Sequence, residues 1–105
     1  MRLKRTVKLR GIRPEMLMGN DIVESVYDKA GLECTITSGN DSKHSRGSLH
    51  FTGAALDYRT RHVPRGKVGD LVLAVKSALG EEFDVLLEHL DKPQEHLHVE
   101  YQPKG

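Results

Sequence analysis

Cysteine, long apolar segments and net charge are all scarce in this sequence, and each scarcity excludes a class of protein. Cys34 is the only cysteine among 105 residues, so no disulfide can form within the chain. It lies beside Thr35 and Ile36. We expect an ordinary buried thiol rather than a nucleophile, because no second cysteine or cationic helix terminus accompanies it.

Long apolar segments are also absent. No stretch approaches the roughly 18 apolar residues that indicate a transmembrane helix. The basic residues near the start are not followed by the apolar region of about seven or more residues that a secretory signal peptide requires. We therefore expect synthesis in the cytoplasm without a signal peptide, so that any action outside the cell would need another route of release.

Charge is nearly balanced, with 16 basic and 15 acidic residues and a formal net charge of +1. This balance argues against a protein built mainly to bind nucleic acid or an anionic membrane. One asymmetry is local, because residues 1–13 contain six basic residues and no acid. We interpret them as a solvated edge strand that its charges protect from aggregation, and attraction to an anionic polymer is the alternative.

The length predicts a single domain over residues 1–105, since most domains have about 100 to 150 residues. Apolar spacing, Pro14 and terminal glycines at 31 and 80 predict two helices. The expected strands are 5–10, 34–37, 54–59, 83–87 and 97–101, the first of them short. Together they predict an α+β fold in which two helices cover one face of a small antiparallel sheet of about four strands.

Two clusters carry candidate chemistry. His50 and Asp57 lie seven residues apart, and the second cluster runs from Glu95 through His96 and His98 to Glu100. Because side chains alternate along a strand, both histidines of the second cluster and Glu100 are expected on one face. Two imidazoles, a carboxylate and a nearby glutamate are typical of a catalytic zinc site with one position open for water.

Taken singly, these residues also have structural interpretations. An aspartate such as Asp57 is common in turns and caps, and an isolated histidine is more often structural than a ligand. We therefore interpret His44, His62 and His89 as structural. It is the presence of both clusters in one chain that favours a metal site.

The motif Ser48-x-His50-x-x-Gly53-x-Ala55-x-Asp57, followed by Glu95-x-x-His98, resembles a family of zinc peptidases. The family includes D-alanyl-D-alanine carboxypeptidases, vancomycin-resistance D,D-dipeptidases and phage L-alanyl-D-glutamate endolysins. The amino-terminal signalling domain of Hedgehog proteins shares its fold. The resemblance covers about two-thirds of the chain, from Thr35 to Tyr101.

This resemblance implies a role for each matching residue. It implies that His50, Asp57 and His98 bind zinc, that Glu95 is the catalytic base, and that His96 assists as a neighbour of the metal or a donor to the tetrahedral intermediate. Glu95 would face away from the histidines in an ideal strand, so we expect its carboxylate to reach the metal from the preceding turn. Ser48 is expected to hydrogen-bond the loop or the Asp57 carboxylate.

Two features depart from the family pattern. Many members carry an arginine shortly after the Ser-Gly that ends the preceding strand, whereas Ser38-Gly39 is followed here by Asn40-Asp41-Ser42. Another basic residue would then have to bind the substrate, and the candidates are Lys43, Arg46 and Arg59. Glu88 is a rival for the base, because it also ends an apolar strand before the histidines. The Glu-x-x-His spacing favours Glu95.

The resemblance implies a zinc metallopeptidase that hydrolyses a peptide bond in the stem peptide of bacterial peptidoglycan, as a carboxypeptidase or an endopeptidase. Such a protein acts at the cell wall after release, for example as a phage endolysin, and we expect a monomer that binds no nucleic acid. The alternative is a non-catalytic module of the same fold that zinc stabilises. A metal-dependent phosphodiesterase lacks enough ligands, and a serine or cysteine hydrolase lacks a matched base.

Overall fold

The two helices begin and end where the sequence signals predict. The computed structural model describes residues 2–3, 12–39 and 54–103, in which α1 spans Pro14–Lys29 and α2 spans Val68–Leu79. Gly31 and Gly80 follow the helix ends with φ of 73° and 82°, a backbone conformation that glycine adopts without a steric penalty. Within the described ranges, neither helix combines the length and apolarity that crossing a bilayer requires.

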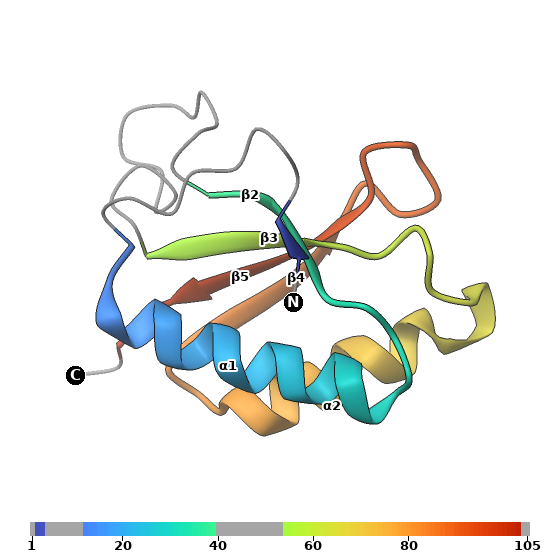
Figure 1. The fold of residues 1–105 in the computed structure, drawn as a ribbon. Coiled ribbons are helices and arrows are strands. Elements are labelled where there is room, and N and C mark those ends of the chain that lie inside the picture. The colour runs from blue at the N-terminus through green and yellow to red at the C-terminus, as the bar shows by residue number, and fades with distance from the viewer. Residues whose placement is uncertain (1, 4–11, 40–53, 104–105) are drawn as a thin grey trace.

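Five strands form one mixed sheet in the order β1-β2-β3-β5-β4 (Figure 1). The strands are β1 (Arg2–Leu3), β2 (Thr35–Ser38), β3 (Ala55–Arg59), β4 (Phe83–Glu88) and β5 (His96–Tyr101), and a short 3-10 helix, η1 (Arg65–Lys67), precedes α2. Four of the expected strands match β2, β3, β4 and β5 in position, while the expected strand 5–10 lies wholly outside the described residues.

The expected purely antiparallel sheet is wrong at one pair of strands. β1 runs parallel to β2, whereas β2–β3, β3–β5 and β5–β4 are antiparallel. A parallel pair needs a crossover connection, and α1 lies in the connection between β1 and β2. A strand of two residues is too short to show an alternating pattern, so no local pattern predicts β1.

The core lies between the sheet and the two helices, which run side by side beneath the same face (Figure 1). Alternate residues of the strands point toward the helices; among them are Leu56, Tyr58, Val85, Leu97 and Val99, all buried. Cys34 joins this core, so the expected buried thiol is confirmed, and burial raises the pKa of the thiol to about 12. The remaining residues of β3, β4 and β5 point to the opposite side, here called the open face.

Two tyrosine hydroxyls fix α1 against β3. Tyr58 donates a hydrogen bond of 2.7 Å to Oδ1 of Asn20 on α1, and both groups are buried. Tyr27 of α1 donates to the backbone carbonyl of Arg59 at 2.9 Å. Because Asp57 directly precedes these two anchor points on β3, the helix contacts help to fix the strand that carries it.

Tyr58→Phe should lower the free energy of unfolding by roughly 1–2 kcal/mol, since it removes a hydrogen bond between buried groups. Urea unfolding monitored by circular dichroism measures the change. Tyr101→Phe is the matched control, because Tyr101 is partly exposed and its change should stay within about 0.5 kcal/mol. Equal stability of Tyr58→Phe and the native protein would contradict this role for the Asn20 contact.

Candidate metal centre

The pairing of β3 with β5 brings together two of the residues singled out from the sequence. Asp57 and His98 are directly opposite each other in the register, and both side chains lie on the open face. On the other side of β5, β4 places Leu86 opposite His98 and Glu88 opposite His96. The open face therefore carries a compact group of carboxylates and imidazoles on three neighbouring strands.

Asp57, Glu88 and His98 form a group that could hold a metal ion, with one ligand atom from each lying within 4.8 Å of the others. Nδ1 of His98 is 2.8 Å from Oδ1 of Asp57 and 3.8 Å from Oε1 of Glu88. Ligand atoms about 2.0–2.1 Å from a tetrahedral ion are roughly 3.3 Å apart. To bind such an ion, the shorter contact would have to open, and the longer one close, by about half an ångström.

His98 faces a carboxylate with each ring nitrogen. Its Nε2 is 2.6 Å from Oε1 of Glu100, in addition to the contact of Nδ1 with Asp57. Burial alone would lower the pKa of His98, but the hydrogen bonds and negative charges of Asp57 and Glu100 outweigh it and raise the pKa to about 9. Near neutral pH the imidazole is therefore charged, and an entering metal ion displaces a proton.

His96 lies beside this group. Its Nε2 is 2.9 Å from Oε1 of Glu88 and 3.6 Å from Oδ2 of Asp57, and its Nδ1 is 2.8 Å from the carbonyl oxygen of Gln94. Because a carbonyl only accepts, the Gln94 contact requires a proton on Nδ1. The ring is thus held with Nε2 directed at the carboxylates of the candidate centre.

Glu95 does not join the group, although the Glu-x-x-His spacing favoured it as the base. Its carboxylate accepts hydrogen bonds from Thr60 Oγ1 at 2.5 Å, Arg65 Nη1 at 2.6 Å and the backbone N–H of Asp91 at 2.9 Å. The side chain is buried. Burial would raise the pKa of Glu95, yet these hydrogen bonds and the Arg65 charge lower it to about 2.

The carboxylate of Glu95 therefore does not extend toward the candidate metal centre as expected, because it is bound elsewhere. The turn before β5 directs the carboxylate to the guanidinium of Arg65, which also donates to the backbone carbonyls of Thr60 and Val63. A buried carboxylate that leaves a cation and a hydroxyl loses several hydrogen bonds at once. Glu88 is the glutamate that the structure places beside Asp57 and His98.

Several predicted residues lie outside the described part of the chain. These are the predicted zinc ligand His50, the supporting Ser48 and the possible substrate-binding residues Lys43 and Arg46. Arg59, the third candidate cation, is exposed at the end of β3 and opposite His96 in the register. His62 contacts the carbonyl of Glu33, as a structural histidine would, whereas the ring centroid of His89 is 5.8 Å from that of His96.

Two supporting residues, Thr60 and Arg65, had not been singled out from the sequence. No local spacing indicates that an arginine 30 positions before Glu95 would bind it. Alternation along β4, in contrast, places Asp84, Leu86 and Glu88 on one face and could have favoured Glu88 earlier.

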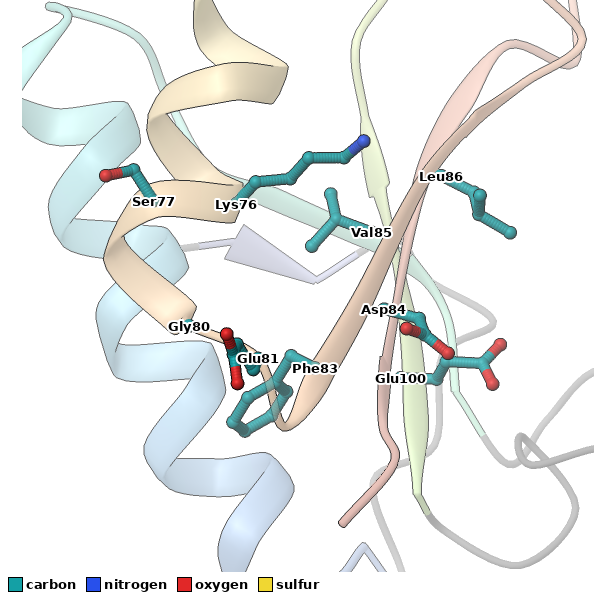
Figure 2. A pocket seen from close by; sticks show the side chains of 9 residues that line it. All are labelled: Lys76, Ser77, Gly80, Glu81, Phe83, Asp84, Val85, Leu86 and Glu100. Carbon is teal, nitrogen blue, oxygen red and sulfur yellow. The ribbon is translucent and has the colours of Figure 1, made fainter. Parts of the chain in front are cut away.

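An open pocket of about 850 Å³ adjoins the candidate centre along the edge strand β4 (Figure 2). Two residues of its lining are neighbours of His98. Leu86 lies opposite His98 in the strand register, and Glu100 contacts its Nε2. Figure 2 shows Asp84, Leu86 and Glu100 on the side of β4 away from α2, and Val85 on the side facing it. The pocket thus extends from the open face around the strand edge.

Comparison with known proteins adds no identification. No protein-family model matches the chain, and no curated protein is significantly similar to it.

Glu95→Gln should reduce stability by roughly 1–3 kcal/mol at neutral pH, because it removes charge-assisted hydrogen bonds from a buried group. The pKa of Glu95 lies below its ordinary value of 4.5, so its contribution is complete above about pH 4.5 and is lost as the pH falls toward about 2. Urea unfolding at several pH values should therefore show the native protein and the variant converging in acid.

Asp91→Asn is the matched control for this measurement. Asp91 contacts the same guanidinium at 3.3 Å, but its side chain is 69% exposed, so its change should be under about 1 kcal/mol. A difference between native protein and Glu95→Gln that is constant from neutral pH to acid would contradict the assigned ionisation.

Proposed function

We propose that the protein is a zinc metallopeptidase that hydrolyses a peptide bond in the stem peptide of bacterial peptidoglycan, with the fold of the D,D-peptidases and the Hedgehog signalling domain. The observation that carries the proposal is the approach of Asp57 and His98, which are 41 positions apart in the chain and both belong to the zinc-binding motif. The sequence motif adds His50 as the third ligand. The five-stranded α+β architecture is compatible with this fold.

Zinc suits the imidazole of His98 and the carboxylate of Asp57, because both groups are among its usual ligands. When bound, zinc would lower the pKa of a water molecule to about 7 and polarise the scissile carbonyl. With His50, Asp57 and His98 as ligands, the carboxylate of Glu88 remains available for proton transfer. We therefore assign the role of general base to Glu88 in preference to Glu95.

Glu88 has the position and exposure that this role requires. Its side chain is 42% exposed, and Oε1 lies within 4 Å of both His96 and His98. It would accept a proton from the attacking water as the new C–O bond forms, and return the proton to the leaving amine as the C–N bond breaks. With both of its ring nitrogens protonated, His96 would donate a hydrogen bond from Nε2 to the developing oxyanion.

The remaining roles concern substrate binding. Arg59 lies beside His96 at the end of β3, where its guanidinium could bind a substrate carboxylate in place of the missing family arginine. The pocket along β4, which Glu100 lines beside His98, is a second place where an extended peptide could bind. Lys43 and Arg46 remain further candidates from the sequence.

A second candidate is a non-catalytic module of the same fold that zinc stabilises. The specific observation in its favour is the position of Glu95, because the residue at the family's base position is bound to Arg65 and Thr60. In this case a metal would strengthen the contact between β3 and β5 without any cleavage.

The native protein should bind about one zinc per chain and release new muropeptide termini from purified peptidoglycan, and a chelator should abolish this release. His98→Ala should lose both zinc and cleavage, while Asp84→Asn, a change on the same face, should retain zinc. Metal analysis and mass spectrometry of the digests measure the outcome. Tight zinc binding with unchanged muropeptides from several wall types would favour the non-catalytic module.

Glu88→Gln should retain zinc and lose activity by about 10²- to 10⁴-fold, the usual contribution of a general base. Glu95→Gln should instead lose stability while the cleavage rate of its folded fraction stays near that of the native protein. Rates are compared at a temperature where both variants are folded. Full activity in Glu88→Gln together with an inactive, folded Glu95→Gln would return the role of base to Glu95.

A further inference from the structure

We propose that Glu100 is a positioning residue for the metal: it holds the proton of His98 on Nε2, so that Nδ1 is the nitrogen that binds the ion. This inference rests on the proposed metal site and extends it to a residue that does not itself touch the ion. Its basis is the arrangement of groups around the two ring nitrogens of His98.

The two nitrogens have different surroundings. Near Nδ1, the carboxylate oxygens of Asp57 and Glu88 lie at 2.8 Å and 3.8 Å. The Nε2 atom of His96 also approaches Asp57, at 3.6 Å. Several potential ligands thus converge on the Nδ1 side of the ring.

Near Nε2, the contact is with Oε1 of Glu100 at 2.6 Å. The other oxygen of this carboxylate, Oε2, accepts a hydrogen bond of 2.6 Å from the side-chain amide of Gln102. Both oxygens of Glu100 are therefore engaged, and its side chain is 17% exposed. A carboxylate fixed in this way is suited to accept a hydrogen bond from Nε2–H and not to join the ligands on the far side of the ring.

The backbone makes the arrangement rigid. Glu100 follows His98 by two positions on β5, so both side chains leave the strand on the same face. β5 is paired on both sides, with β3 and with β4. A carboxylate that receives the second N–H of a metal-binding histidine fixes the tautomer and the ring orientation, and its loss typically weakens metal binding 10- to 100-fold.

Three variants separate this role from the alternatives. Glu100→Leu removes the acceptor, whereas Glu100→Gln removes the charge but keeps a carbonyl oxygen that can accept the bond. Asp84→Asn is the control for charge alone, because Asp84 lies opposite Glu100 on β4. Circular dichroism and thermal unfolding establish that each variant is folded before its zinc affinity is measured by competition with a chelator.

We expect zinc affinity to fall 10- to 100-fold in Glu100→Leu and to stay close to the native value in Glu100→Gln and Asp84→Asn. Equal losses in Glu100→Leu and Glu100→Gln would mean that Glu100 is itself a ligand, and equal affinity in all proteins would mean that it has no role. Either result overturns the inference while leaving the metal site in place. A native protein that binds no zinc would overturn the proposed function as well.

Long-range ¹H–¹⁵N correlation spectra of the zinc-loaded native protein give a direct test of the tautomer. The inference requires a protonated Nε2 and a metal-bound Nδ1 for His98. In Glu100→Leu the Nε2–H signal should broaden or disappear through faster exchange. A protonated Nδ1 with the ion on Nε2 would contradict the assignment, whatever the affinities.

Discussion

The pairing of β3 with β5 is the constraint on which the rest of the molecule depends. One face of this pair supplies Leu56 and Leu97 to the core, and the other brings Asp57 to His98. Because side chains alternate, a shift of one residue in the register would expose the apolar set and separate the two candidate ligands together. The free energy gained by burying the apolar residues therefore also stabilises the register that brings Asp57 to His98 on the open face.

Much of this arrangement follows from local patterns in the sequence. Gly31 and Gly80 mark the helix ends, and alternation in β5 separates His98 from the core residues Leu97 and Val99. Such features can be predicted because they depend on neighbours three or four positions away at most. The approach of Asp57 to His98 was expected from a recognised motif, since spacing alone does not specify which distant strands pair.

The surroundings of Glu95 and the parallel strand β1 could not be predicted in the same way. The direction of a side chain in a turn depends on its partner, and Arg65 lies on a separate segment before α2. Similarly, β1 has two residues and is placed by its backbone pairing with β2. Both features arise from contacts across the fold, and neither leaves a repeating signal in the sequence.

The edge strand β4 has a consequence for self-association. Leu86 is 52% exposed on this strand, and its open-face neighbours along the strand are Asp84 and Glu88. An unpaired strand edge with an exposed leucine is a template for pairing with another chain, and acidic side chains on either side oppose such pairing through their charge. The carboxylate that neighbours the candidate metal ligands thus also places negative charge along the exposed part of this edge strand.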